Sequence, residues 1–157
     1  MLKGMLVTIR HMARHPVVSQ FPEQKLHISR RSRGNELIWS REKCTGCATC
    51  AKACPQGAIE IVTSTNAATN KYDVETYRVD TGYCIQCGLC VEACPYDAVY
   101  LGYSFERARY RREELIQEGD GMAESPTRPI SAYFHPELDE QLPRQTLLVE
   151  KIVEKDE

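Results

Sequence analysis

The chain has 157 residues and a mass of 17.9 kDa, which allows one domain with appendages but not two full enzyme domains. Its formal net charge of −2 argues against nucleic acid as the main partner. Eight cysteines supply part of the 42% hydrophobic content, so the other apolar residues are few for a globular domain, and a ligand of the cysteines is expected to support the fold.

Residues 1–15 have the pattern of an amphipathic helix, because apolar side chains recur there at helical spacing and the basic side chains lie mostly off that stripe. Pro16 is expected to end the helix. No segment approaches the roughly 18 consecutive apolar residues of a membrane span, and no small-residue cleavage site follows, so neither a span nor a signal peptide is expected. The apolar stripe consists of Leu2, Met5, Leu6, Ile9, Met12 and Ala13, and the basic residues are Lys3, Arg10, His11 and Arg14.

Residues 17–35 are predicted to form an extended arm that is rich in arginine. The charge of the chain is unevenly distributed, since residues 1–43 carry a net charge of +6 and residues 44–157 carry −8. A basic N-terminal segment on an acidic body points to an oriented partner, either an anionic membrane surface or an acidic protein. Two solvated faces would give the same pattern. We interpret residues 1–35 as an amphipathic helix followed by a basic docking arm.

Residues 36–103 are predicted to form the compact unit, an α+β arrangement of short strands around cysteine-rich turns. The alternation of apolar and polar residues from Ile59 to Val62 is typical of a half-buried strand, and a similar short strand is expected at 99–101. The other strand pieces are expected at 36–39, 72–74 and 77–79, and a polar loop is expected at 63–70.

Two further segments follow the compact unit. Residues 104–118 have the composition of a charged helix, with Gly119 just beyond its end. Residues 119–157 are rich in Pro, Glu and Asp and are predicted to be extended or partly disordered, or laid along a partner. That tail contains one apolar cluster, which consists of Leu147, Leu148, Val149, Ile152 and Val153.

All eight cysteines lie in two copies of one motif, which indicates an internal duplication. The first copy runs from Cys44 to Pro55 with the pattern C-x2-C-x2-C-x3-C-P. The second copy has the same pattern forty residues later, from Cys84 to Pro95. The cysteines are therefore expected to form two equivalent sites.

This motif predicts two 4Fe–4S clusters. Three closely spaced thiolates can hold three corners of one cube, while the fourth lies on a helical turn that leads away and reaches the cluster of the other copy. Zinc sites usually use well-separated thiolate pairs, and a chain without an export signal is not expected to form a disulfide framework. Because all eight ligands are present, 4Fe clusters are favoured over 3Fe clusters. The first cluster is assigned Cys44, Cys47, Cys50 and Cys94, and the second cluster is assigned Cys54, Cys84, Cys87 and Cys90.

No other group of residues in the sequence suggests chemistry. The sequence has no Ser/His/Asp order that stands out, no phosphate-binding glycine loop and no HExxH motif. The four histidines lie outside the cysteine motifs and are expected to be surface or packing residues. The sequence thus predicts a chain that moves electrons and has no substrate-transforming active site of its own. These histidines are His11, His15, His27 and His135.

The cysteine repeat resembles the bacterial ferredoxins that carry two 4Fe–4S clusters, and its flanks resemble the I-subunit family of NADH–quinone oxidoreductase, which is respiratory complex I. The resemblance covers residues 4–118. It departs from the family at Ser32, where an aromatic residue is usual, and at Thr45, where Ile or Val is common. The similar flanking segments are residues 4–8, 11–12, 21–23 and 33–34 before the motifs and residues 101–106 and 112–116 after them.

The resemblance implies a duplicated ferredoxin-like fold whose two 4Fe–4S clusters lie late in the electron path from flavin to quinone. It implies three partners: the upstream iron–sulfur subunit, the neighbouring subunit with the terminal cluster, and the membrane subunit near the quinone site. It also implies a peripheral position at the cell membrane, on the cytoplasmic side, with the N-terminal helix against the membrane domain or the membrane surface. No nucleic-acid partner is expected.

Three other interpretations remain open from the sequence. A related membrane-bound hydrogenase or formate-linked complex could use such an iron–sulfur subunit. A free ferredoxin would be a diffusing carrier, which has no need of a 43-residue arm and a long tail. A structural zinc protein would lack the visible absorbance of iron–sulfur clusters. The sequence does not identify the electron donor, the quinone type or the cluster potentials.

Overall fold

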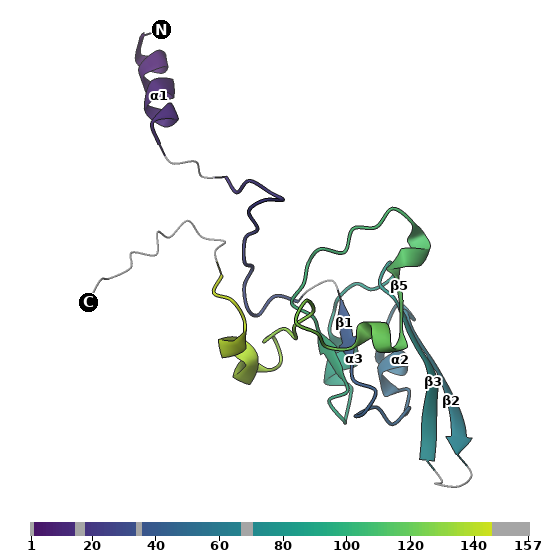
Figure 1. The fold of residues 1–157 in the computed structure, drawn as a ribbon. Coiled ribbons are helices and arrows are strands. Elements are labelled where there is room, and N and C mark those ends of the chain that lie inside the picture. Colours follow the sequence, from purple (N-terminus) through teal and green to yellow (C-terminus); the bar gives the residue numbers. More distant parts are fainter. Residues whose placement is uncertain (1, 15–17, 34–35, 67–70, 146–157) are drawn as a thin grey trace. The chain divides into compact units, whose positions relative to one another are not determined.

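The computed structural model of the chain describes residues 2–14, 18–33, 36–66 and 71–145 (Figure 1). It divides into two units, of which one is Met1–Ser29 with Arg144–Glu157 and the other is Arg30–Pro143. Several residues used in the sequence predictions lie outside the described ranges. They are His15, Pro16, Gly34 and the apolar cluster of Leu147, Leu148, Val149, Ile152 and Val153.

The N-terminal unit contains the expected helix, α1, which spans Leu2–Met12. No residue of α1 is buried, and Leu2 and Met12 are 86% and 87% exposed. The apolar stripe therefore has no covering side chain in this structure. Among the helices that the structure describes, none is both long and apolar enough to cross a membrane.

The second unit contains two small antiparallel sheets. In one sheet, β1 (Leu37–Trp39) pairs with β4 (Val99–Leu101), with Trp39 opposite Val99. In the other, β3 (Lys71–Asp80) lies between β2 (Ile59–Asn66) and β5 (Ile116–Glu118). β2 and β3 form a long hairpin (Figure 1). The polar loop expected at 63–70 is wrong for 63–66, because β2 continues to Asn66, and residues 67–70 lie outside the described ranges.

The two halves of this unit exchange strands. The strand before the first cysteine motif pairs with the strand after the second motif, and the strand after the first motif pairs with the strand before the second. The backbone N–H of Ser40 donates to the carbonyl of Ala98 at 2.8 Å, and the N–H of Asp80 donates to the carbonyl of Ala58 at 2.9 Å. These two hydrogen bonds are related by the forty-residue offset. Each cysteine motif is therefore closed by strands that flank the other motif.

The core lies between the two halves and includes two of the cysteines. Trp39 and Tyr77 stack there with their ring centroids 4.6 Å apart and their planes 3° apart. Burial of these aromatic side chains and of the branched side chains around them contributes to the stability of the unit. The buried residues of this core are Leu37, Trp39, Cys50, Ile59, Val74, Tyr77, Val79, Cys90, Val91, Val99, Leu101 and Met122.

The helix predicted at 104–118 is wrong for most of its length. The described structure has one 3-10 turn, η1 (Arg112–Leu115), which is followed directly by β5. The physical reason is tertiary pairing. Thr81 donates to the carbonyl of Leu115 through both its N–H at 3.1 Å and its hydroxyl at 2.6 Å, and β5 adds a third strand beside β3. These long-range bonds outweigh the weak local preference for helix.

The described part of the predicted tail is not extended away from the domain. Two further 3-10 helices, η2 (Gly119–Met122) and η3 (Pro136–Gln141), belong to the same compact unit. Met122 and Ala132 are 0% exposed. The expected domain boundary at residue 103 thus lies inside the compact unit, because residues after it supply part of the core.

A buried ion cluster ties the segments beside β1 and β4 to the segment near residue 128. The Glu36 carboxylate lies 2.6 Å from the Arg107 guanidinium and 3.1 Å from that of Arg128, and its side chain is 2% exposed. Gly102 makes room for it, because a Cβ at that position would lie 2.3 Å from the Glu36 Cγ. One carboxylate thus compensates two cations that have little access to water.

Glu36→Gln is expected to destabilise the folded chain strongly, because it leaves Arg107 and Arg128 without a compensating charge. Removing one partner of a buried ion pair costs about 3–5 kcal/mol. Thermal melting of the cluster-loaded protein, followed by circular dichroism, measures the effect. Glu113→Gln removes the same charge from an exposed position and is the control. Equal melting temperatures for the two variants would show that the ion cluster does not stabilise the fold.

Candidate metal centre

The two cysteine loops have the same backbone conformation. Residues at equivalent positions adopt a left-handed conformation in both copies. Backbone that mixes left-handed and right-handed residues forms concavities lined by N–H groups, which are found at many iron–sulfur sites. The loops are thus shaped to receive an anionic group. The three equivalent pairs, with their φ angles, are Gly46 (72°) and Gln86 (56°), Ala48 (57°) and Gly88 (83°), and Gly57 (61°) and Asp97 (46°).

Each loop leads into a short helix that positions two thiols. α2 spans Thr49–Ala53 and α3 spans Leu89–Glu92. The third cysteine of each motif, Cys50 or Cys90, lies in the first turn of its helix and is buried. The fourth cysteine follows each helix, where the chain turns toward the other half.

The structure brings Cys54 of the first motif to the three leading cysteines of the second. Cys54, Cys84, Cys87 and Cys90 line one small cavity, whose other walls include Leu37, Ile59 and Leu101. The second predicted ligand set thus faces a common, largely apolar space. This is the arrangement that a cluster shared between the two motifs requires.

Three of the four cysteines in the other predicted set, Cys44, Cys50 and Cys94, also lie together beside the core. Cys44 and Cys94 are close enough to Cys50 to act electrostatically on its thiol. The charge of Cys50 in turn contributes to raising the pKa of Cys90, so the two groups of thiols lie next to each other. All eight cysteines lie in the described ranges and are free, and only Cys47 among them is exposed. The eight free thiols, seven of which lie near one another, fit the donor set of two iron–sulfur clusters, and Cys47 is on the same loop as Cys44 and Cys50.

Hydrogen bonds to sulfur repeat between the copies. The N–H of Ala58 donates to Cys54 Sγ and the N–H of Ala98 donates to Cys94 Sγ, both at 3.3 Å. Such bonds raise the reduction potential of an iron–sulfur cluster because they stabilise its more negative state. The Tyr77 hydroxyl, which sequence reasoning did not identify, donates to Cys50 Sγ at 3.9 Å and has no equivalent at Leu37 in the other copy.

Burial controls the protonation of these thiols. Desolvation raises the pKa of Cys50 and Cys84 above the ordinary value and raises the pKa of Cys90 to about 12. At Cys47 the hydroxyl of Thr49 donates to Sγ at 3.3 Å, and this bond lowers the pKa of the thiol. Since only thiolates bind iron, loading of the site releases protons from the buried cysteines.

The histidines that the structure describes are His11, His27 and His135. His11 and His27 are exposed, and His135 lies 3.0 Å from the carboxylate of Glu137 and beside the ring of Tyr100. Within the described residues, no three His, Cys, Asp or Glu side chains are arranged to hold a single metal ion.

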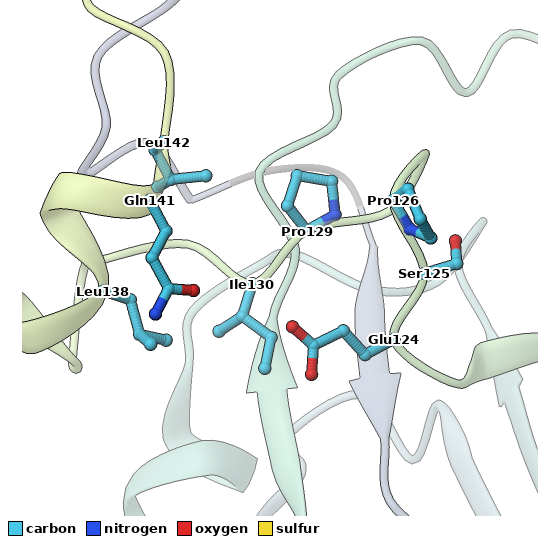
Figure 2. A pocket seen from close by; sticks show the side chains of 8 residues that line it. All are labelled: Glu124, Ser125, Pro126, Pro129, Ile130, Leu138, Gln141 and Leu142. Atoms are coloured by element: carbon cyan, nitrogen blue, oxygen red, sulfur yellow. The ribbon is translucent and has the colours of Figure 1, made fainter.

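A larger cavity lies away from the cysteines. It has a volume of about 510 Å³ and is lined by Ile130, by Leu138 of η3 and by the carboxylate-bearing Glu124 (Figure 2). Figure 2 shows these side chains with those of Pro129, Gln141 and Leu142 around the same space. No cysteine lines this cavity, so it belongs to the packing of the C-terminal segment.

The duplicated fold and the two groups of thiols define a ferredoxin-type protein that binds two 4Fe–4S clusters. The family model of the 4Fe-4S dicluster domain matches residues 43–98, which contain every cysteine. Two curated relatives indicate a more specific family within the ferredoxin-type proteins. The NAD(P)H-quinone oxidoreductase subunit I of Gloeobacter violaceus is 36% identical over 126 residues, which are 80% of this chain and 60% of that protein. The NADH-quinone oxidoreductase subunit I 2 of Geobacter metallireducens is 36% identical over 119 residues, which are 74% of this chain and 90% of that protein.

The chain therefore belongs to the subunit I family of NADH–quinone oxidoreductase. It spans less than two thirds of the length of the Gloeobacter relative. A solved structure supports the fold: a chain of the membrane-bound sulfane sulfur reductase, an archaeal respiratory membrane complex, superposes with a TM-score of 0.50 at 24% identity. That match covers 87% of this chain and 68% of the other chain.

Proposed function

We propose that the chain is an electron-relay subunit of an NADH–quinone oxidoreductase and passes electrons through its two 4Fe–4S clusters toward the quinone-reducing site. The observation that carries the proposal is the convergence of Cys54 with Cys84, Cys87 and Cys90 in one cavity, within a chain of the subunit I family. The proposed first cluster is held by Cys44, Cys47, Cys50 and Cys94, and the second by Cys54, Cys84, Cys87 and Cys90.

The residues of the chain would keep the two clusters close to each other and would exclude water from the space between them. Each cluster supplies a one-electron carrier when it is bound. Because each ligand set takes one thiolate from the other motif, neither centre can move away without unfolding its neighbour. Cys50 and Cys90 lie in the core between the centres and are 6% and 8% exposed. A short gap that excludes water favours transfer between the centres over loss of electrons to solvent oxidants.

The proposed partners are other subunits of the complex and the membrane surface. The upstream iron–sulfur subunit would supply electrons, and the neighbouring subunit with the terminal cluster would receive them near the membrane subunit at the quinone site. The α1 helix is the proposed membrane contact, on the cytoplasmic side. Each fully covered apolar side chain of its stripe would contribute roughly 1.5–3 kcal/mol, and each cation near an anionic leaflet about 1 kcal/mol. Several such contributions are enough for peripheral docking.

Purification of a tagged full-length chain from membranes tests the relay assignment. Both cluster signals are expected to appear by electron paramagnetic resonance when NADH is added to the purified assembly, and quinone is expected to reoxidise them. Recovery of the chain without any other subunit would favour a free ferredoxin. Copurification with clusters that NADH fails to reduce would favour a related membrane-bound complex with another electron donor.

Ile9→Asp is expected to release the chain from the membrane fraction, because it places a charge in the exposed apolar stripe of α1. His11→Asp, on the opposite side of the helix, adds the same charge and is the matched control. Both variants should keep both clusters, since α1 supplies no cysteine. The readouts are membrane-bound protein by immunoblot and NADH-dependent quinone reduction. Equal release by the two variants would mean that charge alone, and not the apolar stripe, governs the membrane contact.

A further inference from the structure

The two cysteine loops differ in what covers them, although their backbones are alike. Cys47 is exposed, whereas its equivalent Cys87 is half-buried. The next residue is Ala48 in the first loop, which is half-buried, and Gly88 in the second loop, which is buried. Both residues have positive φ, which is 57° at Ala48 and 83° at Gly88. The larger angle favours glycine at 88, and the surroundings of the two residues differ as well.

A steric reason for glycine at this position is an aromatic ring that lies against Gly88. A Cβ at Gly88 would lie 3.1 Å from Cε2 and 3.2 Å from Cζ of Phe134, a spacing tighter than ordinary van der Waals contact. Phe134 also packs against the core that holds the cysteines. Glycine at 88 therefore makes room for the ring. In the first loop the chain instead covers position 46, where Thr63 of the hairpin would lie 2.7 Å from an added Cβ.

Phe134 belongs to residues 129–134, here called the strap. Hydrogen bonds hold the strap on both of its sides. On one side the N–H of Ser131 donates to the carbonyl of Leu101 at 2.8 Å. On the other side the N–H of Ala132 donates to the carbonyl of Arg30 at 3.1 Å, and the hydroxyl of Ser131 donates to the carbonyl of Ser32. The strap is thus held between β4 and the basic arm, and its position is fixed by backbone bonds.

Arg33 lies at the edge of the strap and contacts both Tyr133 and Cys87. Its guanidinium lies over the ring of Tyr133, with Cζ 5.0 Å from the ring centroid, and it donates to the carbonyl of Cys87 at 3.5 Å. Tyr133 meets Phe134 edge to face, with the ring centroids 4.7 Å apart. Arg33, Tyr133 and Phe134 thus form a continuous layer of side chains over Gly88 and the neighbouring Cys87.

We infer that the strap seals the second cluster against solvent, with Phe134 as the sealing side chain and Arg33 as the residue that positions it, while the first cluster stays accessible at Cys47. The inference rests on the proposed ligand sets. It assigns a role in this chain to two segments that bear no cysteine and lie a hundred residues apart in the sequence. It also predicts that the two clusters differ in their lability although their ligands are alike.

Iron loss from the full-length chain with both clusters tests the seal. The oxidised protein is incubated with a ferrous-iron chelator, and aliquots are reduced so that the paramagnetic signal of each cluster can be followed. The signals are assigned beforehand with Cys44→Ser and Cys84→Ser. In the unmodified chain, the second cluster should be lost severalfold more slowly than the first. Phe134→Ala should bring the loss of the second cluster close to that of the first and leave the first unchanged.

Matched variants separate sealing from general destabilisation. Phe134→Leu should retain most of the protection, and Tyr110→Ala, at a fully exposed ring, should change neither cluster. If Phe134→Ala fails to hold the second cluster, Arg33→Gln, an exposed change, should still speed the loss of that cluster alone. Unchanged loss of the second cluster, or equal acceleration of both clusters, would overturn the inference. A chain that never shows a second signal would instead refute the proposed ligand sets.

Discussion

Cys54→Ser is expected to remove the signal of the cluster that is bound by the second motif, and to leave the signal of the first motif in place. The reason is positional. Cys54 lines one cavity with Cys84, Cys87 and Cys90, while its own motif gathers around Cys50. Electron paramagnetic resonance of the reduced variant measures the effect as near-complete loss of one of two signals. Iron content should fall by about half, as expected for loss of one of two cubes with four irons each.

The mirror variant gives the control. Cys94→Ser should remove the signal of the first motif and keep that of the second, because Cys94 acts on Cys50 across the core. Cys44→Ser and Cys84→Ser identify which signal belongs to which motif. If Cys54→Ser removed the same signal as Cys44→Ser, each motif would bind its own cluster and the proposed exchange of ligands would be refuted.

Much of the compact unit could be predicted from the sequence because duplication and alternation are local patterns. The strands expected at 36–39 and 99–101 are present as β1 (Leu37–Trp39) and β4 (Val99–Leu101). The forty-residue repeat of the cysteines is also present in the backbone conformation, because residues forty positions apart both have positive φ. The family and its two clusters also followed from the motif and its flanks, since ligand spacing directly constrains the geometry of a cluster.

The segments after β4 could not be predicted in the same way, because long-range contacts determine their structure. The charged composition of 104–118 suggested a helix, but pairing of β5 with β3 gave a strand at its end. Arg112 reaches Asp80 at 2.6 Å, a contact that no local pattern reveals. Likewise the polar composition after residue 119 suggested a loose tail, although a few buried side chains such as Met122 and Ala132 anchor it.

The surroundings of the site were also hidden from the sequence. Nothing in its local pattern marks Phe134 as a neighbour of Gly88 or Tyr77 as a donor to Cys50. One signal was available: the residue after the second cysteine is Ala48 in one copy and Gly88 in the other. Such a difference does not by itself indicate close packing, because Gly57 and Asp97 differ in the same way and nothing lies within 4 Å of a Cβ added at Gly57.

Removal of iron and sulfide is expected to abolish cooperative unfolding of the compact unit. Cys50 and Cys90 are core residues, and Cys44, Cys54 and Cys94 pack against the same core, so loss of the clusters leaves voids at its centre. The other buried group, Ile38, Tyr100 and Ile130, has no cysteine and is too small to hold the unit alone. Structural zinc sites contribute about 10–16 kcal/mol to folding, which is comparable with the whole stability of about 5–15 kcal/mol of a typical domain.

Differential scanning calorimetry of the loaded and the iron-free chain measures this effect. The loaded chain should give a sharp transition, and the iron-free chain should give a broad, low-enthalpy change that becomes sharp again when iron and sulfide are restored. Three later residues oppose this outcome, because Met122 of η2, Ala132 of the strap and Leu142 after η3 add apolar burial that requires no metal. A sharp transition in the iron-free chain would mean that these later segments, and not the clusters, supply most of the stability.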